Sequence, residues 1–139
     1  MWALEGIMEI SRNFNQLSFH DASIESVKRD LERIEVSFDF VIVAPEHPDA
    51  GGEVIELRNA TVTFSSVKSE RALICHDDKS PIEHPNSEAP VNEVMHGTHK
   101  EDYFHFDGFW QPDDWSEWYI YTDNFVVSGR PTEFTRAAF

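Results

Sequence analysis

Hydrophobic and polar residues alternate along much of this chain with a period of two, which is typical of β-strands that bury one face. The clearest run covers residues 34–43. Its apolar side consists of Ile34, Val36, Phe38, Phe40 and Ile42. The opposite side turns apolar at Val41 and Val43, so we expect this end of the strand to be covered on both faces. Residues 23–28 precede it across a short polar connection, which predicts a β-hairpin.

Residues 53–66 resume the alternation but change phase near Asn59, which predicts a β-bulge. Residues 69–75 fit another short strand. Strands are also predicted at residues 103–110, 117–122 and 125–128, with turn residues between them, and we interpret these three as a consecutive meander.

Residues 77–100 differ from the rest, because prolines, acids and histidines interrupt any apolar period. We predict a long irregular loop here, with one helical turn near residues 91–95. The remaining pattern predicts a mainly β protein, an antiparallel sandwich or barrel of about seven to eight strands, with an α+β arrangement as the alternative. A single domain would span residues 1–139, with a lead-in at 1–16 and a tail at 130–139.

Charge narrows the classes of partner. Eleven basic and 26 acidic side chains give the 139-residue chain a formal net charge of −15. This charge repels nucleic acids and anionic membrane surfaces and attracts basic proteins. Cys75 is the single cysteine, so it forms no intrachain disulfide. Residues 1–10 lack the basic start of an export signal, and no apolar run approaches the ~20 residues of a membrane span, so we expect a cytoplasmic protein.

The stretch from Glu101 to Val127 has the most unusual composition. Ten of the 18 aromatic residues lie between Tyr103 and Phe125, together with several acids, and no Lys or Arg occurs from Glu101 to Gly129. Aromatic rings are enriched at protein interfaces, and carboxylates steer a cationic partner toward them. We therefore predict a non-enzymatic protein that binds a basic protein partner, and the sequence leaves self-association open. Its expected contacts are Asp107, Asp113, Asp114, Trp115 and Glu117.

Histidines give an alternative hypothesis, a metal-binding domain or metal-dependent enzyme. Its ligands would come from His76, Asp78, His96, His99 and His105. Imidazoles and carboxylates suit zinc, but no HExxH or CxxC spacing is present, so the preferred expectation is no metal and no cofactor.

Catalytic motifs are missing from the sequence. His20 and Asp21 are adjacent, but adjacent residues of a strand point to opposite faces, so we expect a structural role for the pair. Neither a GxSxG elbow nor a glycine-rich phosphate loop occurs, and the chain is predicted not to be an enzyme. A third hypothesis is a sandwich that binds a ligand through exposed tryptophans, as carbohydrate-binding modules do.

The segment from Leu17 to Val27, which contains Phe19-His20-Asp21-Ala22, resembles the start of small bacterial proteins with an FHDA or FHDS signature. Some of these are grouped with immunity proteins of polymorphic toxin systems. The resemblance covers about a dozen residues. It implies a cytoplasmic β-rich antitoxin that blocks a toxin, often a basic nuclease, by binding. Phe19, His20 and Asp21 would then be signature positions with a structural duty.

Overall fold

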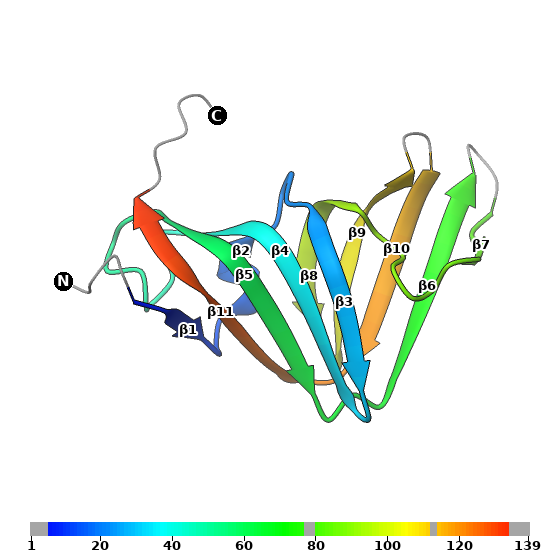
Figure 1. Ribbon diagram of the computed structural model, residues 1–139, viewed down its shortest axis with the longest axis horizontal. Coiled ribbons are helices and arrows are strands. Elements are labelled where there is room, and N and C mark those ends of the chain that lie inside the picture. The colour runs from blue at the N-terminus through cyan, green and yellow to red at the C-terminus, as the bar shows by residue number, and fades with distance from the viewer. Residues whose placement is uncertain (1–5, 77–79, 112–113, 134–139) are drawn as a thin grey trace.

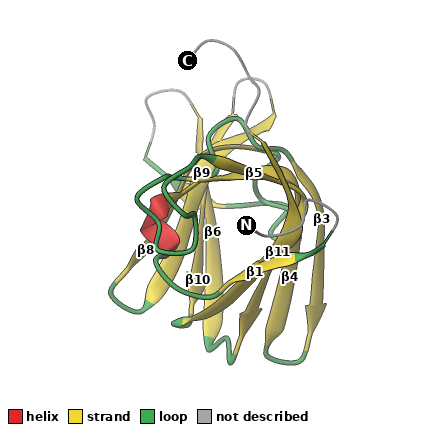
Figure 2. Cartoon of the chain, turned by 90° about the vertical axis from the view of Figure 1, so that its left-hand side faces the viewer, coloured by secondary structure: helices red, strands yellow, loops and turns green. Residues whose placement is uncertain are grey.

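The computed structural model describes residues 6–76, 80–111 and 114–133. They form two antiparallel β-sheets, one of them curled into a half-barrel (Figures 1 and 2). The mainly β class predicted from the alternation is therefore confirmed. None of the helices within the described residues is long and apolar enough to cross a membrane.

The described residues contain eleven strands and one short 3-10 helix. In chain order these are β1 (Met8–Ile10), η1 (Phe14–Gln16), β2 (Leu17–Ser18), β3 (Ile24–Asp30), β4 (Arg33–Val43), β5 (Ile55–Ser65), β6 (Ser69–His76), β7 (Ile82–Glu83), β8 (Glu93–Lys100), β9 (Tyr103–Gln111), β10 (Asp114–Tyr121) and β11 (Asn124–Glu133). One sheet has the order β1-β11-β5-β4-β2, and β3 also pairs with β4. The five-stranded sheet has the order β7-β6-β10-β9-β8.

The strongest sequence signals are borne out. β4 covers the predicted run and pairs with β3 as a hairpin. Val41 and Val43 are fully buried, and Phe40 on the opposite parity is 5% exposed, so this end is covered on both faces. The phase change near Asn59 is a bulge. Ser128 pairs with Thr61 and Arg130 pairs with Arg58, so the single residue Gly129 of β11 lies opposite both Asn59 and Ala60 of β5. Asn59 has the left-handed φ of 49°.

The predicted meander is wrong. β9 and β10 pair with each other, but β11 crosses to the other sheet and pairs with β5 and β1, while β6 takes the second side of β10 (Figure 1). Phe125 and Val127 are buried in the core. The chain crosses from one sheet to the other at the turn before Phe125. Thr122 stabilises this turn, because its hydroxyl donates to Ser65 O at 2.7 Å.

The expected loop at 77–100 is also wrong in its second half, where β8 pairs with β9 over residues 93–100. Of the residues of β8, only Val94 is buried, so the apolar alternation that would reveal a strand is absent. Gly108 permits the close approach at the irregular start of this pairing, since a Cβ there would lie 2.0 Å from Glu93 O. The predicted helical turn near 91–95 does not form. Residues 77–79 lie outside the described ranges.

The expected boundaries at both ends are corrected too. The lead-in at 1–16 contains β1, which pairs with β11, and the tail expected from residue 130 begins inside β11. Ile10 is fully buried, and backbone pairing with β5 continues through residue 133, so residues 8–10 and 130–133 belong to the sheet.

Phe19 joins the inner faces of the two sheets. Its ring centroid lies 5.1 Å from that of Phe38 on β4 and 5.3 Å from that of Phe106 on β9. The turn that follows is bonded to the edge of the other sheet, since Asp21 N donates to Val94 O at 2.9 Å and Val94 N donates to Ala22 O at 2.8 Å. The FHDA segment thus connects the first sheet to β8.

Candidate functional site

The outer face of β9 and β10 carries a regular cross-strand arrangement. Phe104 and Phe106 on β9, and Trp118 and Ile120 on β10, are buried in the core. The residues between them point to the opposite face, because side chains alternate along a strand. Three facing pairs follow along this outer face: Phe109 with Trp115, Asp107 with Glu117, and His105 with Tyr119. We call these six residues the acid–aromatic ladder.

The aromatic pairs of the ladder are in contact. The rings of Phe109 and Trp115 meet edge to face with centroids 5.2 Å apart. His105 stacks on Tyr119 at 4.5 Å. Tyr103 extends this end of the ladder, with its centroid 5.5 Å from those of both Tyr119 and Tyr121. Aromatic surface therefore lies on both sides of the acidic pair.

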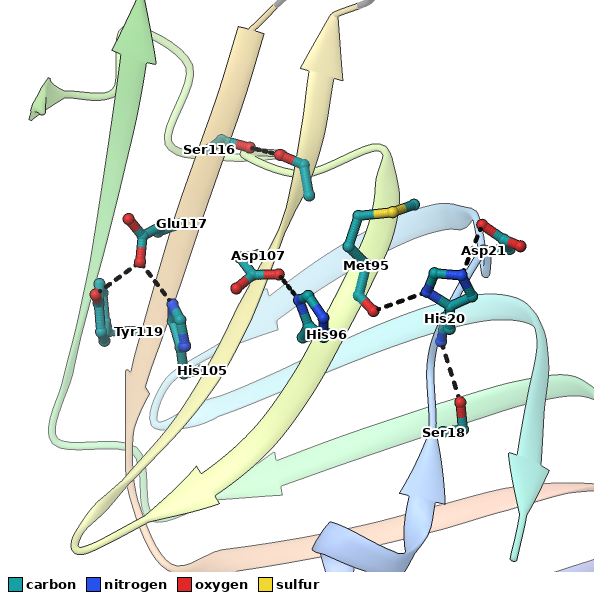
Figure 3. A network of polar contacts seen from close by, with 11 residues as sticks. Ser18, His20, Asp21, Met95, His96, His105, Asp107, Ser116, Glu117 and Tyr119 are labelled. Carbon is teal, nitrogen blue, oxygen red and sulfur yellow. Dashed lines mark hydrogen bonds and ion pairs between the residues drawn. The ribbon is translucent and has the colours of Figure 1, made fainter. Parts of the chain in front are cut away.

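Asp107 and Glu117 are held by histidines (Figure 3). His96 Nδ1 on β8 lies 2.8 Å from Asp107 Oδ1, and His105 Nε2 lies 2.9 Å from Glu117 Oε1. Tyr119 donates its hydroxyl hydrogen to the same Glu117 oxygen at 3.0 Å. Each carboxylate is therefore oriented by a histidine and not by a lysine or arginine.

Cations lie at the margins of this face. Lys100 of β8 is the register partner of Tyr103, and Arg71 of β6 is the register partner of Tyr119. Arg71 is already bonded to Glu83 at 3.0 Å. No salt bridge joins Asp107 or Glu117 to Lys or Arg within the described residues.

The structure places four of the five predicted partner contacts. Asp107, Trp115 and Glu117 belong to the acid–aromatic ladder. Asp114 is the first residue of β10 and precedes the register shift, and its carboxylate is 3.0 Å from His76 Nδ1. Asp113 lies outside the described residues.

The alternative metal ligands do not come together. His76, His96, His99 and His105 pair with four different carboxylates, those of Asp114, Asp107, Asp123 and Glu117. Across the described part of the chain, no three His, Cys, Asp or Glu side chains are placed to hold one metal ion. Asp78 falls outside that part.

His20 and Asp21 occupy a turn, not a strand, so the expectation that they point apart does not hold. Asp21 has a left-handed φ of 67°, and its carboxylate lies 3.6 Å from His20 Nε2. His20 Nδ1 lies 3.3 Å from Met95 O on β8 (Figure 3). Both side chains are more than half exposed. His20 borders a shallow groove of about 190 Å³ between β2 and β8.

Cys75 faces Trp115 across β6 and β10. Burial, and then the charge of Glu117, raise the pKa of its thiol above the ordinary value. A thiol with a raised pKa contains little thiolate at neutral pH, so Cys75 is poorly suited to be a nucleophile.

A larger cleft of about 460 Å³ lies between β3 and β6, but its main polar groups bind one another. Arg29 donates to both carboxylate oxygens of Glu70, at 2.7 and 2.8 Å, and to the carbonyl oxygens of Ser87 and Glu88. Trp118 Nε1 donates to the same carboxylate at 3.0 Å. This network pairs the half-buried charges of Arg29 and Glu70 with each other and joins the two sheets.

Comparison of the chain with protein-family models, curated proteins and solved structures gives no significant match. The functional interpretation therefore depends on the geometry and charge of the chain itself.

The sequence pointed to the acids and Trp115 but missed the other members of the ladder. His105, Asp107 and Phe109 occupy alternate positions, and so do Trp115, Glu117 and Tyr119. That period of two was visible and places each set on one face of its strand. The register that sets Asp107 opposite Glu117 was not visible, because it depends on a register shift between Asp114 and Trp115 that leaves Trp110 of β9 unpaired.

Proposed function

We propose that this protein is a non-enzymatic, immunity-type binding protein that neutralises a basic protein partner, and that the acid–aromatic ladder is its contact surface. The observation that carries the proposal is the pair of facing carboxylates, Asp107 and Glu117, flanked by aromatic rings and held by histidines. The two sheets would serve as a sandwich-like scaffold that keeps this surface flat and rigid.

Charge supports the class of partner. The chain has a formal net charge of −15, and the segment from Glu101 to Gly129 contains no Lys or Arg. Such a surface attracts cationic proteins over long range and accelerates their association. The resemblance of the FHDA segment to immunity proteins agrees with this class, and a bacterial cytoplasm would be the compartment in which a toxin is blocked.

Burial supports a packed contact surface. His105 and Asp107 each have side chains only 16% exposed, and both are hydrogen-bonded to a neighbouring side chain. Side chains that are already ordered lose little conformational entropy when a partner binds. A surface of this kind favours binding over catalysis, and Cys75 beside it is a poor nucleophile.

The test is a binding titration with a basic candidate partner, beginning with the product of the reading frame immediately upstream. Asp107→Lys with Glu117→Lys should abolish binding, and added salt should weaken the binding of the unchanged protein because exposed charges are screened beyond about 8–10 Å. The matched control, Glu46→Lys with Glu53→Lys on the β4–β5 loop, makes the same change in charge and should retain most of the affinity. Equal affinities for the ladder variant and the control would refute the proposed surface.

A further inference from the structure

The order of the pairs in the acid–aromatic ladder suggests what kind of side chain it binds. The acidic pair lies between the Phe109–Trp115 pair and the His105–Tyr119 pair. Successive outward pairs are two residues apart, or about 7 Å along the strands. A cation placed over Asp107 and Glu117 therefore has ring surface within reach on both sides.

This combination favours arginine over lysine. A guanidinium group is planar, donates hydrogen bonds to two carboxylates at once, and stacks on aromatic rings. A lysine ammonium is a compact and strongly hydrated charge, which gains less from the flanking rings. The chain uses the same chemistry internally, since Arg29 binds Glu70 through two nitrogens and lies 5.8 Å from the centre of the Trp118 ring.

The repulsion between the carboxylates of Asp107 and Glu117 is a second argument for a cationic ligand. Like charges directly opposite each other on neighbouring strands destabilise a sheet. His96 and His105 orient the two carboxylates, and Tyr119 donates a further hydrogen bond, but these groups add no fixed positive charge. Among the residues that the structure describes, Lys100 and Arg71 lie at the margins of this face as register partners of Tyr103 and Tyr119, not of the acids. A cation from outside would relieve the repulsion between Asp107 and Glu117.

We infer that the acid–aromatic ladder is an arginine-recognition site, in which an arginine side chain of the partner binds across Asp107 and Glu117 with the Phe109–Trp115 and His105–Tyr119 rings on either side. This inference rests on the proposed function and narrows the partner to a basic protein that presents an exposed arginine. The flanking rings select the guanidinium group, and the two carboxylates supply most of the attraction.

Synthetic hexapeptides of arginine, lysine and citrulline test the inference without a known partner. Their affinities for the full chain are measured at physiological salt by amide chemical shifts of β9 and β10, which remain available in every variant. We expect hexa-arginine to bind about three- to tenfold more tightly than hexa-lysine, and hexa-citrulline not to bind, because citrulline keeps the planar shape and loses the charge. Trp115→Ala should reduce the preference for arginine while leaving the binding of lysine.

Variants separate the inference from the proposal on which it rests. Asp107→Asn with Glu117→Gln should remove the arginine preference and the shifts at β9 and β10, whereas Glu46→Gln with Glu53→Gln removes the same charge elsewhere and should change neither. Equal binding of hexa-arginine and hexa-lysine that is still lost in the ladder variant would overturn arginine recognition and leave the acidic contact surface standing. Equal effects of the ladder and control variants on both peptides would overturn both.

Discussion

Asp107 and Glu117 face each other directly across β9 and β10 on the outer side of the five-stranded sheet. Each is held by an imidazole from a neighbouring position, at 2.8 Å from His96 and 2.9 Å from His105. Facing carboxylates reduce the stability of a sheet, so their presence is better explained by binding than by folding.

Asp107→Asn should stabilise the isolated protein. The amide oxygen can still accept the hydrogen bond from His96, while the repulsion with Glu117 disappears. We expect the free energy of unfolding to rise by about 0.2–1 kcal/mol. Urea denaturation at pH 8, where histidine side chains are mainly neutral, measures this change. Glu46→Gln on the β4–β5 loop is the control, and a loss of stability in Asp107→Asn would show that the repulsion is not felt in the folded sheet.

Tyr119 should ionise unusually late. Burial, followed by its hydrogen bond to Glu117 and the charge of that residue, raises the pKa of Tyr119 to about 12. Between pH 10 and about 12, the folded protein keeps the Tyr119 proton that the unfolded chain has lost. The protonated side chain therefore adds its full contribution to the free energy of unfolding below the ordinary tyrosine pKa of 10.0, and this contribution is lost as pH rises toward about 12. An ultraviolet titration of the three tyrosines should show one late transition. Glu117→Gln should move it to lower pH, and an unmoved transition would assign the effect to burial alone.

His84 should make the fold sensitive to acid. It is buried, its Nε2 lies 3.0 Å from Pro90 O, and its Nδ1 accepts the Asn86 amide hydrogen at 2.9 Å. Burial lowers the pKa of His84, which outweighs the opposing effects of Pro90 and Asp114. The neutral form is therefore favoured in the fold, and its stabilisation is lost as pH falls below the ordinary value of 6.5. When the pH is lowered from 8 to 5, the urea concentration at the midpoint of unfolding should decrease more in the unchanged protein than in His84→Gln. Equal decreases would contradict the role of His84 in acid sensitivity.

Arg29 should contribute more to the free energy of unfolding than the exposed cation Arg33. Arg29→Ala removes four hydrogen bonds and leaves Glu70, whose side chain is 27% exposed, with only the Trp118 indole. We expect a loss of about 1.5–3 kcal/mol in the free energy of unfolding. Arg33→Ala is the matched control, because its ion pair with Glu35 is exposed and should contribute about 0–1 kcal/mol. Similar losses in the two variants would show that Arg29 does not join the sheets.

Local patterning predicted those parts of the fold that a single strand determines. The alternation in residues 34–43 requires β4, and the phase change near Asn59 requires a bulge. The pairing of β11 could not be predicted, because Phe125 and Val127 would fit the core of either sheet. β8 was missed because it is an edge strand whose two histidines and glycine resemble a loop.

The sequence predicts some residues of the candidate site but not how they pair. Composition predicts Asp107, Trp115 and Glu117 as contacts, and that prediction stays untested. Their histidine partners enter the sequence-based prediction only as ligands of the alternative metal site. The partners are separated by 11 residues for Asp107 and His96 and by 12 for Glu117 and His105. Only the register between strands reveals such pairs.

Asn15 and His20 should keep β8 from pairing with another chain. β8 is the last strand of its sheet, and unpaired edges promote association. Asn15 Nδ2 donates to His99 O at 2.9 Å and Asn15 Oδ1 accepts from His99 N at 2.7 Å, while His20 Nδ1 lies 3.3 Å from Met95 O. These side chains occupy backbone groups that a neighbouring strand would use.

Asn15→Ala with His20→Ala should therefore produce concentration-dependent dimers in sedimentation experiments. Added salt should not dissociate them, because backbone hydrogen bonds and not exposed charges would hold the two copies together. Asn124→Ala with His76→Ala removes the same side-chain types away from this edge and should not increase association. If the Asn15/His20 variant associates no more than this control at any concentration, the edge of β8 must be protected by its twist and not by these two residues.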